Sequence, residues 1–166
     1  MACELCTLLQ SGNFKELLLL ETEHALALFS DKPASKGHII VLPKNHFVIL
    51  EHVPDEILSE LFLLANACST AIFDALMVQG TNILIQNGSS AGQVTPHFMI
   101  HVLGREDKDN VQLSWNPIQL SEEVLLKQQD LIKRALQTPV GEKMSTPRDL
   151  SKEKENYILK QLDRIA

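Results

Sequence analysis

The stretch NILIQNGSSAGQVTPHFMIHVL, residues 82–103, decides how this chain is interpreted. Its two apolar runs are joined by the small-residue loop 87–92, whose backbone amides can approach a ligand closely. Side chains alternate between the two faces of a strand, so the second run separates into a polar and an apolar face. The polar face holds His97, Met99 and His101, and the apolar face, which we expect in the core, holds Phe98, Ile100 and Val102.

The residues around this stretch predict an α+β fold. Short apolar runs bounded by turn residues favour strands at 17–20, 25–29 and 38–42, in addition to 81–86 and 97–103. Between residues 54 and 80, apolar side chains recur every three or four positions, which predicts one long helix. Further helices are expected from Ser121 and after Thr146. We therefore expect a mainly antiparallel five-stranded sheet with the long helix on one face, a domain over 1–136, and a C-terminal linker and helical extension over 137–166.

Composition narrows the class of protein. The chain has 166 residues, of which 45% are hydrophobic and 22% charged, as in a globular domain. Its net charge of −6 is opposite in sign to the surface that nucleic acid or an anionic membrane requires. No apolar stretch is expected to approach the roughly 18 to 20 residues of a spanning helix, and the first residues do not resemble a secretory leader. We expect a cytoplasmic protein without a nucleic-acid or membrane partner.

Residues 82–103 resemble the signature of the histidine triad (HIT) superfamily, in which Ala-Gly-Gln precedes the pattern His, apolar, His, apolar, His and two apolar residues. A second family stretch is matched by Asp31, Pro33, Gly37-His38, Pro43-Lys44 and His46. The resemblance covers residues 3–136 and implies a HIT-like fold. It also implies a homodimer in which two five-stranded sheets join into a ten-stranded sheet.

The sequence departs from the family at one position. The resemblance makes His97, Met99 and His101 the catalytic triad, and the family's middle histidine is the nucleophile that attacks the α-phosphorus of a nucleotide. A thioether has no proton to give and no basic lone pair at neutral pH, so Met99 cannot perform that step. His97 and His101 each lie two residues away, about 6.6 Å along a strand, so neither replaces the nucleophile without moving the phosphate.

The resemblance also implies a nucleotide-binding set. His38 and His101 would line the phosphate site, Asn87 and Gln93 would bond phosphate oxygens, and Asp31 would bond a ribose hydroxyl. Neutral donors can hold phosphate in an acidic protein because such hydrogen bonds are charge-assisted. Without the resemblance, Asp31 ahead of Lys32-Pro33 is better explained by an ordinary Asx-type turn.

A second candidate site begins at the N-terminus. Cys3-x-x-Cys6 has the spacing of a thiolate pair in a structural zinc site. By resemblance to some HIT proteins, His46 and His97 would complete a tetrahedral Zn²⁺ site. Cys-x-x-Cys alone equally fits two free thiols or a redox pair.

The expected function is binding of a purine nucleotide such as AMP, or of a nucleotide conjugate, with hydrolase or transferase activity weak or absent. One alternative is an active HIT enzyme that uses the remaining histidines. Another is a zinc-stabilised dimeric interaction module with a vestigial pocket.

Overall fold

The computed structural model describes residues 3–136. Contacts divide these residues into two units, 3–111 and 112–136, and each is described by itself. The helix predicted after Thr146 and the extension over 137–166 lie outside the described residues. The predicted domain boundary after residue 136 therefore stays a prediction.

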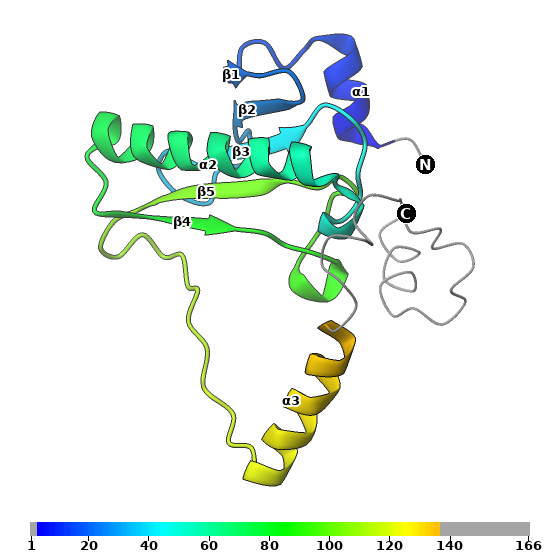
Figure 1. Cartoon of the computed structure of the whole chain (residues 1–166). Helices are drawn as coiled ribbons and strands as arrows, with labels where there is room; N and C mark the ends of the chain where they lie inside the picture. Colours follow the sequence, from blue (N-terminus) through cyan, green and yellow to red (C-terminus); the bar gives the residue numbers. More distant parts are fainter. Residues whose placement is uncertain (1–2, 137–166) are drawn as a thin grey trace. The chain divides into compact units, whose positions relative to one another are not determined.

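The first unit is built on one antiparallel sheet with the strand order β1-β2-β3-β5-β4 (Figure 1). Its elements are α1 (Glu4–Ser11), β1 (Leu18–Glu21), β2 (Ala25–Phe29), β3 (Ile39–Pro43), α2 (Asp55–Leu76), β4 (Gly80–Leu84) and β5 (Ile100–Arg105), with single 3-10 turns at Leu50–His52 and Ser89–Ala91. The predicted five-stranded α+β fold with one long helix is confirmed. The short helix α1 was not expected from the sequence.

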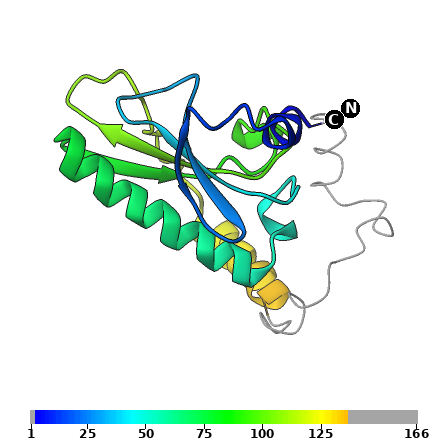
Figure 2. The same cartoon turned by 90° about the horizontal axis from the view of Figure 1, so that it is seen from above.

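The helix α2 covers one face of the sheet (Figure 2). Acidic Asp55 and Glu56 occupy its first turn, where they complement the positive end of the helix dipole. The helix ends at Leu76 because the next residue, Met77, has a φ of 54° and leaves the helical region, so it stops before the predicted Gly80. Each large aliphatic side chain buried against the sheet contributes about 1.5–3 kcal/mol. The buried residues of α2 are Ile57, Leu61, Leu64, Ala65, Cys68 and Ile72.

This helix also corrects one expectation from the sequence. By length and composition alone, α2 is long and apolar enough to cross a membrane. The expectation that no segment approaches that length was therefore wrong. In the described structure α2 packs against β2, β3, β4 and β5, so its apolar side chains form the core beneath the sheet.

The opposite face of the sheet carries a second, smaller apolar cluster. Its buried members are Leu26, Leu28 and Leu42, against which Leu5 and Leu9 of α1 pack. Met99 packs against the same cluster. The two faces of the sheet are therefore covered by different helices, α2 on one and α1 on the other (Figure 2).

The strand β5 begins at Ile100 rather than at the predicted His97. Its pairing with β3 starts at Ile100 and its pairing with β4 starts at His101, so the residues before them have no ladder partner in the described sheet. The predicted alternation nevertheless holds, because Phe98, Ile100 and Val102 all lie in the core under α2.

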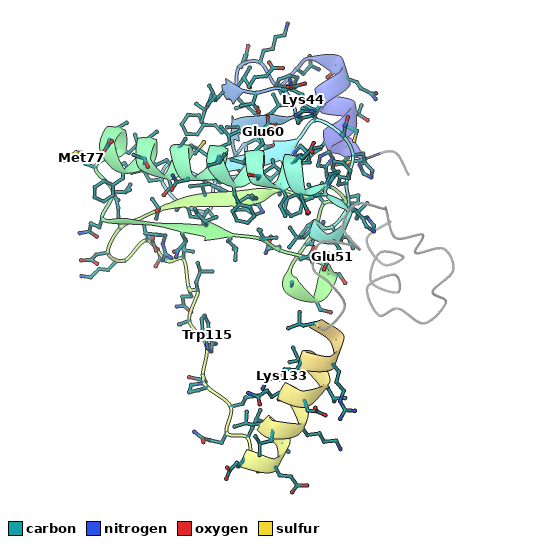
Figure 3. All side chains as sticks on the ribbon, viewed as in Figure 1. Lys44, Glu51, Glu60, Met77, Trp115 and Lys133 are labelled. Carbon is teal, nitrogen blue, oxygen red and sulfur yellow. The ribbon has the colours of Figure 1, made fainter. Side chains whose placement is uncertain are left out.

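The second unit contains α3 (Glu122–Leu136), which agrees with the helix predicted from Ser121. Acidic residues open this helix, and Lys133 and Arg134 occupy its last turn. Every described residue of this unit, 112–136, is exposed to solvent, and Trp115 is 85% exposed (Figure 3).

A hydrogen-bonded carboxylate ties the β1–β2 turn to α2. Glu60 of α2 (Figure 3) accepts from the backbone N–H of His24 at 3.1 Å and lies 2.9 Å from His24 Nδ1. The Thr22 hydroxyl, then the His24 backbone N–H and ring, lower the pKa of Glu60 to about 2 from 4.5. A lowered carboxylate pKa stabilises the fold above pH 4.5, and this contribution is lost as pH falls toward 2.

We expect Glu60→Gln to lower the free energy of unfolding at pH 7 by about 1–2 kcal/mol, because the amide cannot accept the same charge-assisted bonds. The difference from wild type should shrink as pH falls from 4.5 toward 2. Urea unfolding at several pH values measures this, with Glu16→Gln, at an exposed position, as the control. A difference that stays constant across that pH range would contradict the assignment.

Candidate functional site

The candidate site lies on the sheet face away from α2. Ile40 of β3 pairs with His101 of β5, and paired residues present their side chains to the same face. His38, two residues before Ile40, and Met99, two residues before His101, share that face by alternation. The β3–β5 register therefore brings two sequence-predicted site residues together from positions 63 apart.

His38 and His101 are in direct contact. His38 Nε2 lies 3.0 Å from His101 Nδ1, and the ring centroids are 5.2 Å apart. Burial, followed by the nearby His101, lowers the pKa of His38 to about 4. Burial likewise lowers the pKa of His101. Both rings are therefore neutral at pH 7, so the site offers hydrogen-bonding groups rather than imidazolium charge.

Met99 is half-buried and packs against the aliphatic cluster of Leu26, Leu28 and Leu42, on the same sheet face as His38 and His101. Its thioether is a weak acceptor without an ionisable proton. At this position the candidate site therefore offers an apolar group in place of an imidazole.

The loop after β4 is closed by Gln93. The Oε1 of Gln93 accepts from the Gly88 N–H at 2.8 Å, and its Nε2 donates to Val48 O at 2.7 Å and to Thr95 O at 3.0 Å. The Gln93 side-chain NH₂ group thus donates both of its hydrogens to backbone carbonyls. The phosphate contact predicted for Gln93 stays a prediction, and it requires one of these bonds to be exchanged.

Asn87 is also engaged within the protein. Its Oδ1 accepts from the Leu50 N–H at 2.9 Å, and its Nδ2 lies 3.0 Å from both carboxylate oxygens of Glu51 (Figure 3). Asn87 therefore fastens the loop to the 3-10 turn at Leu50–His52, which sequence reasoning did not anticipate. Its predicted phosphate contact also stays a prediction.

Gln86 is a loop residue that the sequence analysis missed. Gly92 has a φ of +89°, and a Cβ added there would lie 2.6 Å from Gln86 Nε2. The Gln86 amide therefore rests directly against the glycine backbone of the loop. The local signal was the glycine itself, because a glycine is needed where another group approaches the backbone this closely.

Asp31, unlike Asn87 and Gln93, is an exposed residue. It is exposed in the turn between β2 and β3, next to Lys32, whose N–H donates to the Ser30 hydroxyl. This position is compatible with a ribose contact and with an ordinary turn, so the predicted role of Asp31 stays a prediction.

A second constellation assembles Cys3, Cys6, His46 and His97, as predicted. One candidate ligand atom from each residue lies within 4.8 Å of those of all the others. The cysteines come from the start of α1, His46 follows β3, and His97 precedes β5. His97 Nδ1 lies 3.7 Å from Cys3 Sγ and 3.5 Å from Cys6 Sγ, and His46 Nδ1 lies 3.2 Å from Cys6 Sγ.

These distances fit a tetrahedral metal centre. Zn–S and Zn–N bonds of ordinary length place sulfur and nitrogen ligands about 3.6 Å apart. His97 Nε2 lies 3.0 Å from Pro43 O, and a carbonyl only accepts, so Nε2 carries the proton and Nδ1 has a lone pair facing the sulfurs. Metal-binding histidines are commonly oriented in this way. Burial, and then the neighbouring Cys3, raise the pKa of the Cys6 thiol to about 11, which a bound cation would reverse.

The histidine pair on the face away from the long helix, above an antiparallel five-stranded sheet, defines an α+β domain of the histidine triad class. The HIT domain family model matches residues 11–108, and the chain belongs to that family.

Three relatives illustrate the family. The chain is 32% identical over 107 residues to "Adenylylsulfatase HINT3" of Arabidopsis thaliana, a match that covers 64% of this chain and 54% of that relative. A HIT family protein from Bacillus subtilis superposes with a TM-score of 0.74 at 27% identity, over 82% of this chain and 98% of its own. A zinc-bound histidine triad family protein from Mycobacterium smegmatis matches with a TM-score of 0.61 at 28% identity, over 80% of this chain and 98% of its own.

Proposed function

We propose that this protein binds a purine nucleotide such as AMP, or a nucleotide conjugate, and hydrolyses or transfers it weakly or not at all. The nucleotide would bind at the triad face, by which we mean the sheet face away from α2 that carries His38, Met99 and His101. The observation that carries the proposal is Met99, which stands between His97 and His101 and packs against an aliphatic cluster. Membership of the HIT family and the adenylyl substrate in the name of a relative support the ligand class.

His97 is a poor replacement for the missing nucleophile. Its ring is fully buried, its Nε2 is bonded to Pro43 O, and its Nδ1 faces the two cysteine sulfurs. An attacking nitrogen needs both a free lone pair and access to phosphorus. The His97 ring has neither toward a ligand on the triad face.

A second candidate function is an interaction module whose nucleotide pocket is vestigial. It is favoured by Asn87 and Gln93, whose amides already hold Glu51, Val48 and Thr95. Calorimetry with AMP distinguishes the two functions, because an interaction module with a vestigial pocket does not bind AMP. The remaining alternative, an active enzyme, differs from both in releasing AMP from adenosine phosphoramidate.

The Met99→His variant tests the proposal directly. We expect wild type to bind AMP in calorimetry without appreciable release of AMP from adenosine phosphoramidate. Met99→His should raise turnover by about two orders of magnitude or more, because it restores an imidazole at the nucleophile position. AMP affinity should change by less than about tenfold.

The matched control is Met77→His, since Met77 is exposed at the end of α2, outside the triad face (Figure 3). It should leave turnover at the wild-type level. If wild type already turns over as fast as Met99→His, Met99 is not the reason for low activity. If wild type does not bind AMP, the interaction module is the better account.

We further propose that Cys3, Cys6, His46 and His97 hold a structural Zn²⁺. Four protein ligands close the coordination shell, so the ion would supply cross-linking rather than Lewis-acid chemistry. It would fix the first turn of α1, a helix without a buried residue of its own, to the segments that precede β5 and follow β3. The zinc-bound relative from Mycobacterium smegmatis supports the choice of metal.

We expect about one zinc per chain in untagged protein purified without chelator, measured by elemental analysis. Cys6→Ala should remove the metal and speed amide hydrogen exchange across Glu4–Ser11, because α1 loses its anchor. Cys68→Ala is the control, since Cys68 is buried under the sheet and outside the cluster. Zinc-free wild-type protein would remove His97 from the set of metal ligands.

We also propose a homodimer formed at β4. Among the described residues, β4 is an edge strand that pairs only with β5. Ile83 of β4 is 45% exposed, and Phe62 and Phe73 of α2 are exposed on the helix turns that bracket Ser69. The Ser69 hydroxyl lies 2.6 Å from that of Thr81 in β4, so this side of α2 borders the strand. An open edge beside exposed apolar side chains suits a second copy, which would extend the sheet to ten strands.

The dimer predicts a molar mass of two chains in light scattering. A double variant, Phe73→Asp with Ile83→Asp, should yield single chains, because the carboxylates would be buried without partners. Leu20→Asp is the control, since exposed Leu20 belongs to β1 at the opposite edge of the sheet. A dimer that only Leu20→Asp dissociates would place the interface at β1. We propose a reducing, cytoplasmic location because Cys3, Cys6 and Cys68 form no disulfide. No nucleic-acid partner is proposed for a chain of net charge −6.

A further inference from the structure

The hydrogen bonds through the two triad-face histidines run in one direction. The backbone N–H of Ala34 donates to His38 Nδ1 at 3.0 Å. A backbone amide can only donate, so His38 Nδ1 must carry a lone pair rather than a proton. Because the His38 ring is neutral at pH 7, its one proton resides on Nε2.

The direction continues into His101. His38 Nε2 lies 3.0 Å from His101 Nδ1, and with the proton on His38 Nε2 the His101 nitrogen is the acceptor. The neutral His101 ring then carries its own proton on Nε2. That nitrogen has no hydrogen-bond partner among the described residues 3–136, and it is not one of their buried unpaired atoms, so it is open to solvent.

We propose that His38 is a positioning residue that holds His101 in the Nε2–H tautomer, so that His101 meets a bound ligand only as a hydrogen-bond donor to an acceptor oxygen. The ligand part of this inference rests on the proposed function, in which that oxygen belongs to the phosphate. His38 itself does not contact the ligand, because both of its ring nitrogens are occupied. This replaces the phosphate contact that the sequence predicted for His38.

The fold holds the first ring in place. His38 is 6% exposed and lies just before β3. Its carbonyl accepts from the Ser30 N–H at 3.0 Å, and its own N–H donates to Ser35 O at 3.3 Å. These bonds close the turn that presents the Ala34 N–H to the ring. A flip of the ring would therefore break the part-buried hydrogen bond from the Ala34 N–H, which is unfavourable.

A locked tautomer limits the chemistry of His101. Its Nε2 has no lone pair in the ring plane while it carries the proton, so it cannot attack phosphorus. Moving the proton to Nδ1 would set two N–H groups against each other unless His38 also changed tautomer, and His38 would then oppose the Ala34 N–H. The pair therefore selects ligands that present an oxygen acceptor, such as a phosphate ester, and does not restore the nucleophile.

The tautomer can be read directly. Long-range ¹H–¹⁵N correlation spectra of the full chain with ¹⁵N-labelled histidine, recorded without ligand, report which ring nitrogen of His101 is protonated. We expect Nε2–H in wild type. In His38→Phe, which keeps a ring but removes the donor, the Nδ1–H form of His101 should appear. AMP affinity should fall about three- to tenfold, the effect of one hydrogen bond.

His38→Gln is the conservative variant, because its side-chain N–H can still donate toward His101 Nδ1. It should keep the Nε2–H tautomer and bind AMP within about twofold of wild type, and it decides the question if His38→Phe does not fold. His52→Phe, at a histidine of the 3-10 turn after β3, should leave the His101 spectrum unchanged.

The spectra separate this inference from the proposed function. If AMP does not bind but the His101 tautomer responds to His38→Phe and not to His38→Gln, the positioning role stands and the proposed function fails. An Nδ1–H tautomer in wild type overturns the inference, and so does an Nε2–H tautomer that persists in His38→Phe.

Discussion

The antiparallel pairing of β3 with β5 is the constraint on which both candidate sites depend. With Ile40 opposite His101, the residues at even spacing from each face the side of the sheet away from α2. Val41 and Ile100 close the other face over the core. A shift of one residue would exchange the two faces and bury imidazoles under α2. The hydrophobic core therefore fixes the position of the chemistry, because the same register that buries Val102 presents His101.

Much of this arrangement follows from local periodicity. Two-residue alternation is a property of the strand itself, so the division of residues 97–103 between faces could be predicted without any partner. The period of α2 identified its buried side in the same way. The start of β5 could not be predicted, because it depends on where β3 and β4 stop pairing with it. The helix α1 escaped prediction since its apolar residues rest on a cluster contributed by later strands.

The grouping of the candidate site residues could be predicted from the sequence, but most of their hydrogen bonds could not. The sequence grouped Cys3, Cys6, His46 and His97, and the fold brings their ligand atoms together. It assigned Asn87 and Gln93 to a ligand, although in the structure their amides hold Glu51, Val48 and Thr95. Those partners lie on the segment after β3 or are backbone carbonyls, which leave no signature in a sequence. Composition can indicate that a polar side chain is available, but only the fold shows whether its bonds are already used.

The three histidines that the sequence assigned to the candidate site, His38, His97 and His101, each have their ring nitrogens engaged differently. His97 has its nitrogens turned to Pro43 and to the cysteine sulfurs, and His38 has both of its nitrogens bonded. His101 alone keeps a nitrogen open to solvent, and the hydrogen-bond direction through His38 makes that nitrogen a donor. A neutral imidazole N–H is a weak acid, so His101 is as poorly suited to protonating a leaving group as to attacking phosphorus. The low activity proposed for this chain therefore has two separate origins, the thioether of Met99 and the direction of a hydrogen-bond chain that begins at a backbone amide.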